Sequence, residues 1–201
     1  MQMWVFGYGS LLWNPGFAYV EKHLARLTGY RRSFCMRSIH HRGTPASPGL
    51  VLALDADSAA ICDGLAFRIA PKNEEQVLAY LRARELISSA YYEKNVRLDL
   101  LEGGQLEALA YVINQTNEQY CRGLSLKEQA RIIATARGGR GDNSEYLFKT
   151  VEQMEKLSIQ DADLQWLAQD VRARLAKKDR RPFPSSAMDR PCVTSKVNHN
   201  A

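Results

Sequence analysis

A glycine-rich segment directly after a short apolar run constrains this chain more than any other feature. The apolar run Met3–Phe6 leads straight into Gly7-Tyr8-Gly9-Ser10. Glycine has no Cβ, so two glycines in three residues allow a sharp turn and a close approach of the backbone to a ligand. Backbone N–H groups in such a turn can converge on a carboxylate or a phosphate. From these residues alone, a tight turn that binds nothing is the simpler interpretation.

Length and composition describe an ordinary globular chain. Its 201 residues suffice for one sizeable core or two small ones. The apolar fraction of 45% and the charged fraction of 24% are typical of soluble proteins. The sequence has no run of about 18 apolar residues, so we expect no membrane span. It also lacks a basic segment followed by an apolar one at its N-terminus, so we expect no secretory signal.

The cysteines and histidines indicate neither a disulfide framework nor a metal site. No two cysteines have the C-x-x-C spacing, and the adjacent His40 and His41 have only two other histidines in the chain to join them. We therefore expect free thiols in a reducing cytoplasm and no bound metal. The four cysteines are Cys35, Cys62, Cys121 and Cys192.

The net charge of +5 is concentrated at one end of the chain. Residues 172–201 carry eight Lys or Arg and two Asp, a local charge of +6. The preceding 171 residues carry 19 basic and 20 acidic side chains, so that part is almost neutral. A nucleic-acid surface requires basic residues clustered on the folded body. We therefore expect no nucleic-acid partner, although the tail alone could touch acidic lipid or nucleic acid, or could simply be solvated.

The order of the elements predicts an α+β fold with strands first and most helices later. Alternating apolar residues predict strands, and Glu102–Gln105 predicts a hairpin turn between the last two. We expect helices after Asn73, after the Ser125-x-x-Glu128 capping box, after Asp142 or Asn143, and after Asp161. The glycines of residues 138–141 are expected to end the second helix. The predicted strands are Trp4–Tyr8, Tyr30–Met36, Leu50–Leu54, Asp63–Ile69, Asn95–Leu100 and Leu106–Val112.

From about Lys177 the periodicity stops, and charged, proline and serine residues dominate. We therefore expect one domain over residues 1–176 and a basic, mobile tail over residues 177–201.

Five segments, in the same order, resemble the ChaC-type family of glutathione-specific γ-glutamylcyclotransferases, and together they cover most of residues 3–150. One glycine turn is weak support, whereas five ordered segments are strong. The segments are Val5–Phe17 with its Gly-Tyr-Gly-Ser string, Gly29–Phe34, the His-Arg-Gly-Thr-Pro loop His41–Pro45 with Pro48-Gly49, Arg84-Glu85 followed by Tyr91, and Ile133–Ala136 with Asn143-x-x-Tyr146-Leu147.

The resemblance implies a small closed or nearly closed mixed β-sheet surrounded by helices. It implies a lyase that cleaves glutathione into 5-oxoproline and cysteinylglycine, without a cofactor or a metal, by attack of the substrate's α-amine on its γ-carbonyl. It assigns proton transfer to Glu85. The substrate-binding loop would be Gly7, Tyr8, Gly9, Ser10, Leu11 and Leu12, with Tyr8 either lining the pocket through its ring or binding a polar group through its hydroxyl.

The residues around Glu85 also support this role. Leu86-Ile87 follows it and would partly desolvate the carboxylate, which raises its pKa toward the working pH of a general acid or base. Without the resemblance, a solvated carboxylate is the simpler interpretation. The chain departs from the family at Ser88-Ser89-Ala90, where many members have two glycines before the aromatic residue, so loop flexibility and substrate preference stay open.

Two further side chains have open alternatives. Arg42 would either pair with a substrate carboxylate or form an ion pair that fixes its loop. Tyr146 would either line the pocket or belong to a helix surface or the core. The function also has alternatives: the same chemistry on another γ-glutamyl amino acid or amine, or a non-catalytic regulator of cation transport. Retention of both the Gly-Tyr-Gly-Ser string and Glu85 favours the enzyme.

Overall fold

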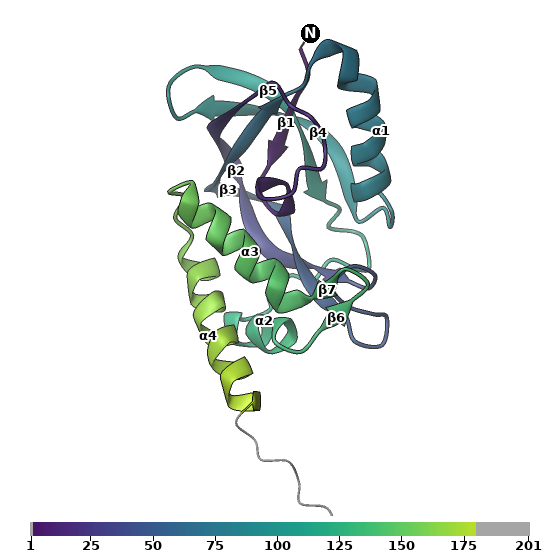
Figure 1. The fold of residues 1–201 in the computed structure, drawn as a ribbon, viewed down its shortest axis with the longest axis vertical. Helices are drawn as coiled ribbons and strands as arrows, with labels where there is room; N and C mark the ends of the chain where they lie inside the picture. Colours follow the sequence, from purple (N-terminus) through teal and green to yellow (C-terminus); the bar gives the residue numbers. More distant parts are fainter. Residues whose placement is uncertain (1, 180–201) are drawn as a thin grey trace, which may run out of the picture.

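Five strands close into a mixed barrel in the computed structural model, which describes residues 2–179 (Figure 1). Their order around the barrel is β1-β3-β2-β4-β5, and the barrel closes where β1 runs parallel to β5, with Val5 beside Leu109. The expected closed mixed sheet is thereby confirmed. The strands are β1 (Trp4–Gly7), β2 (Glu21–Ser38), β3 (Gly49–Arg68), β4 (Tyr91–Leu100) and β5 (Gln105–Ile113).

One long hairpin, β2 with β3, forms most of the barrel. The two strands pair antiparallel from Glu21 opposite Arg68 to Ser38 opposite Gly49. The prediction of two separate strands at 50–54 and 63–69 was wrong, because a single strand of 20 residues spans both. The polar stretch between them does not end the strand. The pairing instead skips residues 57–60 opposite Gly29, whose φ of +85° only glycine adopts readily.

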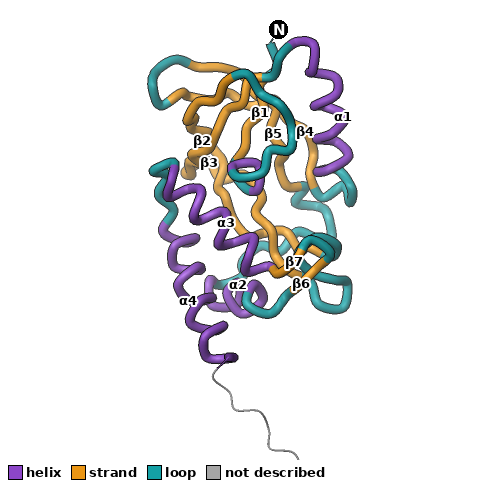
Figure 2. The backbone as a smooth tube through the Cα atoms, in the orientation of Figure 1, coloured by secondary structure: helices purple, strands orange, loops and turns teal. Residues whose placement is uncertain are grey.

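Within residues 2–179, four α-helices surround the barrel. Helix α1 (Glu74–Glu85) follows the short 3-10 turn η2 (Pro71–Asn73) and lies on one side. Helices α2 (Leu126–Ile133), α3 (Asn143–Lys156) and α4 (Ala162–Asp179) pack together on the other side (Figure 1, Figure 2). The 3-10 turn η1 (Ser10–Leu12), which follows β1, contacts α3. None of the helices within residues 2–179 combines the length and apolar character needed to cross a bilayer.

The buried apolar side chains of residues 2–179 form three clusters: one inside the barrel, one under α1 and one under the other three helices. The barrel interior contains Phe6, Leu54 and Leu98. A second cluster lies under α1 and includes Val77 and Leu81. The third joins the outer face of β2 and β3 to helices α2, α3 and α4, as layered packing of amphipathic elements requires.

The local signals for helix starts were mostly correct. The Ser125–Glu128 capping box is present, with the Glu128 N–H donating to Ser125 Oγ over 3.3 Å. Asp161 caps α4 by accepting the Leu164 N–H over 3.1 Å. Asn73 and Asp142 stand at the predicted helix starts, but neither side chain makes a capping hydrogen bond.

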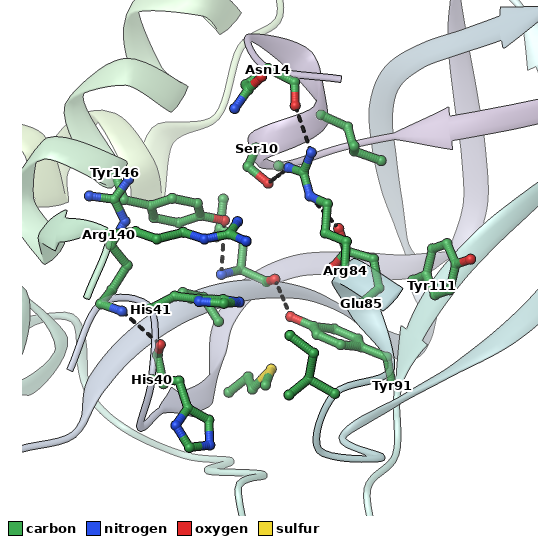
Figure 3. A pocket seen from close by; sticks show the side chains of 18 of the residues that line it. Ser10, Asn14, His40, His41, Arg84, Glu85, Tyr91, Tyr111, Arg140 and Tyr146 are labelled. Carbon is green, nitrogen blue, oxygen red and sulfur yellow. Dashed lines mark hydrogen bonds and ion pairs between the residues drawn. The ribbon is translucent and has the colours of Figure 1, made fainter. Parts of the chain in front are cut away.

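The prediction that the glycines of residues 138–141 end α2 was wrong. The helix ends at Ile133, and the glycines form a small hairpin of β6 (Arg137–Gly138) and β7 (Gly141–Asp142). A Cβ on Gly138 would lie 2.6 Å from the main-chain carbon of His41, so glycine is required for a close backbone approach. The turn of this hairpin carries Arg140, which Figure 3 shows beside His41.

Helix α4 continues to Asp179, past Lys177, where we expected the tail to begin. The rest of that predicted tail, including Cys192, lies outside the described residues.

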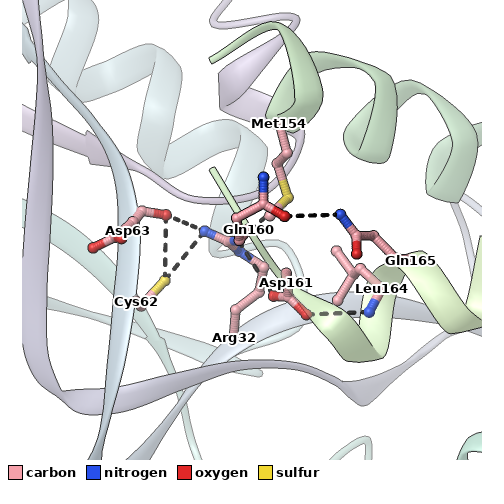
Figure 4. A network of polar contacts seen from close by, with 8 residues as sticks. All are labelled: Arg32, Cys62, Asp63, Met154, Gln160, Asp161, Leu164 and Gln165. Atoms are coloured by element: carbon pink, nitrogen blue, oxygen red, sulfur yellow. Dashed lines mark hydrogen bonds and ion pairs between the residues drawn. The ribbon is translucent and has the colours of Figure 1, made fainter. Parts of the chain in front are cut away.

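Arg32 on β2 joins the barrel to the C-terminal helices (Figure 4). Its side chain is 3% exposed. Nη1 lies 3.2 Å from Sδ of Met154 in α3 and 3.5 Å from Oδ2 of Asp161 before α4. Nη2 donates to the main-chain oxygen of Asp63 and lies 3.4 Å from Sγ of Cys62. Asp161 therefore has two tasks, because it is the carboxylate partner of a buried arginine and the cap of α4.

Replacing Asp161 by alanine is expected to lower the free energy of unfolding by about 2–3 kcal/mol, since it removes a helix cap and leaves the Arg32 charge buried without a carboxylate. Urea unfolding followed by circular dichroism would measure the change. Asp163→Ala is the matched control, because this exposed carboxylate lies in the same helical turn and its loss is expected to cost less than about 1 kcal/mol. Equal losses for both variants would contradict a role for the Arg32 contact.

Candidate active site

A cavity of about 340 Å³ opens where four segments meet (Figure 3). These segments are the loop after β1, the end of α1, residues 38–42 after β2, and the β6–β7 turn with the first turns of α3. From the resemblance, the loop after β1 and Glu85 at the end of α1 were expected to form the site, whereas roles there for Arg42 and Tyr146 were left open and the β6–β7 turn was not expected. Segments far apart in sequence thus contribute side chains to a single cavity.

The Gly-Tyr-Gly-Ser loop forms one wall. Of the six predicted substrate-binding residues, Tyr8, Gly9, Ser10 and Leu11 line the cavity. The other two lie behind the wall: Gly7 belongs to β1, and Leu12 is buried in the core cluster shared with α3. The hydrogen bonds of η1 begin with the Leu12 N–H, which donates to the Gly9 oxygen over 3.0 Å. The N–H groups at the start of such a turn have no acceptor within it.

Both glycines of the loop pack so closely against neighbouring side chains that a Cβ atom would be crowded at either position. A Cβ on Gly7 would lie 2.9 Å from Leu11 Cβ and from Phe67 Cε2. A Cβ on Gly9 would lie 3.1 Å from the hydroxyl of Tyr146. Neither glycine has a positive φ. The string therefore reflects tight packing between the loop, the barrel and α3.

Glu85 is the last residue of α1, and its side chain is 20% exposed in the cavity. Burial raises the pKa of its carboxyl group above the ordinary value of 4.5, while the charges of Arg84 and Arg140 lower it. The two residues predicted to desolvate Glu85, Leu86 and Ile87, differ in burial. Leu86 packs in the cluster under α1, whereas Ile87 is 56% exposed and shields little. Of this pair, Ile87 lines the cavity without being buried, so side chains from other elements account for most of the burial of Glu85.

Tyrosine side chains surround Glu85. The Tyr8 hydroxyl donates to the main-chain oxygen of Tyr111 over 2.8 Å, and the Tyr91 hydroxyl donates to that of Leu52 over 2.9 Å. Burial raises the pKa of both hydroxyls well above 10, and the negative charge of Glu85 adds to the effect. The two groups are therefore neutral hydrogen-bond donors at any working pH. Of the two roles expected for Tyr8, the structure displays the ring that lines the cavity, while its hydroxyl is bound to the backbone of Tyr111.

Arg84 connects Glu85 to the Gly-Tyr-Gly-Ser loop, a role the sequence did not indicate. Its Nε lies 3.0 Å from Oε1 of Glu85, and its Nη2 donates to Oγ of Ser10 over 2.8 Å. Its Nη1 donates to the main-chain oxygens of Asn14 and Pro15 over 2.9 and 3.1 Å. The side chain is only 8% exposed. One guanidinium thus fixes the end of α1 against the loop.

The Asn-x-x-Tyr string of α3 holds the edge of β3 beside the cavity. Asn143 accepts the Leu50 N–H over 2.6 Å and donates to the Leu50 oxygen over 2.7 Å. The Tyr146 hydroxyl accepts the Leu52 N–H over 3.3 Å. Tyr146 is 6% exposed and lines the cavity, so it is both a core and a pocket residue.

The loop that carries His41 and Arg42 lies beside this string. Arg42 Nη1 donates to Glu145 Oε2 and to the main-chain oxygen of Asp142, each over 2.9 Å. Of its two proposed roles, the structure thus displays the ion pair that fixes the loop. Burial, followed by the charge of Arg140, lowers the pKa of His41. Within residues 2–179, no three His, Cys, Asp or Glu side chains converge as a metal site would require.

The Ser88-Ser89-Ala90 segment keeps the backbone shape that glycine favours. Ser89 has a φ of +54°, a left-handed conformation that is uncommon outside glycine. Ser88 lines the cavity, and its main-chain oxygen accepts a hydrogen bond from Asn117 Nδ2 over 3.3 Å. Where many family members have glycine, this chain thus places a serine in a left-handed conformation.

Comparisons with known proteins agree on one family. The sequence model of the family described as ChaC-like protein matches residues 3–174. The glutathione-specific gamma-glutamylcyclotransferase of Escherichia coli strain K12 is 35% identical over 186 residues, which span 92% of this chain and 78% of that protein. The protein of the same name from Schizosaccharomyces pombe is 36% identical and spans 87% and 95% of the two chains. Among solved structures, a yeast gamma-glutamyl cyclotransferase specific to glutathione superimposes with a TM-score of 0.76 at 26% identity, covering 87% of this chain and all of that one.

Replacing Arg84 by methionine is expected to raise the pKa of Glu85 further, because the arginine charge and hydrogen bond oppose the effect of burial. A carbon-13 NMR titration of the Glu85 carboxyl group would measure the shift. Arg82→Met is the control on the same helix, since Arg82 pairs with Glu93 and is expected to leave the Glu85 titration unchanged. An unchanged or lowered pKa in Arg84→Met would contradict this account of the site.

Proposed function

The chain belongs to the ChaC-like family, and from that premise we propose that it is a γ-glutamylcyclotransferase that converts glutathione into 5-oxoproline and cysteinylglycine. The observation that carries this proposal is Glu85, a carboxyl group of raised pKa that lies in a cavity beside the Gly-Tyr-Gly-Ser loop. A raised pKa brings a carboxyl group closer to the working pH of a general acid or base, which both accepts and returns a proton. Arg84 Nε contacts the Glu85 carboxylate over 3.0 Å, and buried tyrosines line the same cavity.

The reaction is an internal transfer in which no atom is gained from a cofactor. The Glu85 carboxylate accepts a proton from the α-ammonium group of the substrate. The freed amine nitrogen attacks the γ-carbonyl carbon and forms the C–N bond of the five-membered ring. The γ-glutamyl amide bond then breaks as Glu85 gives its proton to the leaving nitrogen of cysteinylglycine. The ring nitrogen still carries one extra proton, which passes through the emptied Glu85 carboxylate to the released amine, so that cysteinylglycine leaves as an ammonium. Glutathione thereby becomes the two products with no other reactant.

Ring closure requires the substrate to be folded before it reacts. Holding an amine against a carbonyl in a reactive geometry can supply about 7 kcal/mol or more of the barrier. We assign this task to the loop formed by Gly7, Tyr8, Gly9, Ser10, Leu11 and Leu12. The N–H groups at the start of η1 and the Ser10 hydroxyl are suited to the α-carboxylate, while Gly7 and Leu12 support the wall from behind.

Replacing Glu85 by glutamine is expected to reduce 5-oxoproline release by about 100- to 10,000-fold, because the near-isosteric amide cannot accept the proton. Release from reduced glutathione would be measured by chromatography. Glu75→Gln is the control, since this exposed carboxylate on the same helix lies away from the cavity and its loss is expected to leave turnover unchanged. Full activity in Glu85→Gln would remove Glu85 from the mechanism while leaving the reaction in place.

We further propose that residues 1–176 carry the activity in the cytoplasm, that the partner is a small γ-glutamyl molecule rather than a nucleic acid, and that the basic tail has no catalytic part. The three described cysteines, Cys35, Cys62 and Cys121, are free and buried, which suits a reducing compartment. The segments that line the cavity all lie within residues 6–149.

A chain ending after Asp179 keeps all of α4, which packs against the core through side chains such as Leu175. This truncated protein is expected to have the same kcat and KM for glutathione as the full chain, measured side by side at two salt concentrations. A large loss of turnover would contradict the assignment of the activity to the folded domain alone.

A further inference from the structure

One of the cationic side chains that line the cavity has no carboxylate partner within residues 2–179 and no part in the proposed reaction. Arg140 lies in the turn between β6 and β7 and lines the cavity. Its main-chain N–H donates to the His41 oxygen over 2.9 Å, which fixes the turn to the loop below it. Figure 3 shows its guanidinium reaching inward above His41, on the side of the cavity that faces Glu85.

The charges of the other cations around the cavity are already matched by carboxylates. Arg84 contacts Glu85, and both Arg42 and Lys149 contact Glu145, over 2.9 and 2.7 Å. Arg140 forms no ion pair with any carboxylate of residues 2–179. Its charge nevertheless acts on the cavity, because it lowers the pKa values of both Glu85 and His41.

The chemistry of the substrate supplies the missing anion. Glutathione has two carboxylates, and the Gly-Tyr-Gly-Ser loop accounts for the one on the γ-glutamyl residue. The second belongs to the terminal glycine and lies two residues, or about 7 Å in an extended chain, beyond the bond that breaks. A guanidinium has a planar fork of N–H donors that matches a carboxylate with two parallel hydrogen bonds.

We propose that Arg140 binds the glycine carboxylate of glutathione and thereby selects the tripeptide over γ-glutamyl amines and amino acids, an inference that rests on the function proposed above. A γ-glutamyl amine has no such carboxylate, and a γ-glutamyl amino acid presents its carboxylate one residue closer to the reacting bond. Arg140 is thus a specificity-determining residue, and it binds the part of the substrate that leaves as cysteinylglycine.

The test compares glutathione with its glycine monoethyl ester, in which an ethyl group replaces the negative charge of the second carboxylate while the γ-glutamyl end is unchanged. The wild-type protein is expected to favour glutathione in kcat/KM by about 10- to 100-fold, the range of a hydrogen-bonded charge pair. Arg140→Ala is expected to lose this preference, mainly through a higher KM for glutathione, with the ester almost unaffected. Arg140→Lys, which keeps the charge without the fork, is expected to lie between them.

Arg137→Ala is the matched control. Arg137 lies on the same hairpin, has a side chain that is 75% exposed, pairs with Asp142 over 3.6 Å and does not line the cavity. Its substitution is expected to change neither substrate. An equal loss of activity on both substrates in Arg140→Ala would overturn the proposal, since it would indicate a general effect on Glu85 or on folding. Equal wild-type rates on glutathione and the ester would overturn it as well, while leaving the proposed reaction intact.

A binding measurement distinguishes a failure of the proposed function from a failure of the Arg140 proposal. If the wild-type protein released no 5-oxoproline from glutathione, calorimetric titration of the two ligands into the Glu85→Gln variant would still measure the preference. Tighter binding of glutathione than of the ester, lost on adding Arg140→Ala, would support the Arg140 site without turnover. Equal binding of both ligands would reject it.

Discussion

The guanidinium of Arg84 determines the spacing of the site. It contacts the Glu85 carboxylate at the end of α1, and it also contacts Ser10, Asn14 and Pro15 in the loop after β1. Because it is almost fully buried, these contacts form in a low-dielectric environment, where charge-assisted hydrogen bonds are strong. Glu85 and the loop after β1 are therefore positioned relative to each other by one side chain, which contacts both.

Burial and nearby positive charges shift the pKa of Glu85 in opposite directions. Burial among Tyr8, Tyr91 and Tyr146 favours the neutral carboxyl, while Arg84 and Arg140 favour the carboxylate. Burial has the larger effect, so the pKa is raised but the group remains titratable. This balance suits a residue that must hold a proton only briefly. The same cationic side of the cavity complements a substrate with two carboxylates.

Local signals predicted the elements whose hydrogen bonds are themselves local. The Ser125 capping box, the Asp161 cap and the Gly103-Gly104 turn each depend on residues within a few positions, and each is present. The predictions failed where a distant partner decided the structure. Pairing with β2 carries β3 through its polar middle, and the approach of His41 places Gly138 in a hairpin instead of a helix cap.

The sequence by itself determined the family and the reaction class and singled out Glu85 as the proposed acid/base residue, because these depend on residue types in a fixed order along the chain. Only the tertiary structure decided which groups surround Glu85. Ile87, its near neighbour in sequence, is exposed, whereas Tyr8, Tyr91 and Tyr146 come from three separate elements. Closing the barrel and packing α3 on it brings these side chains together, and burial depends on such contacts rather than on distance along the chain.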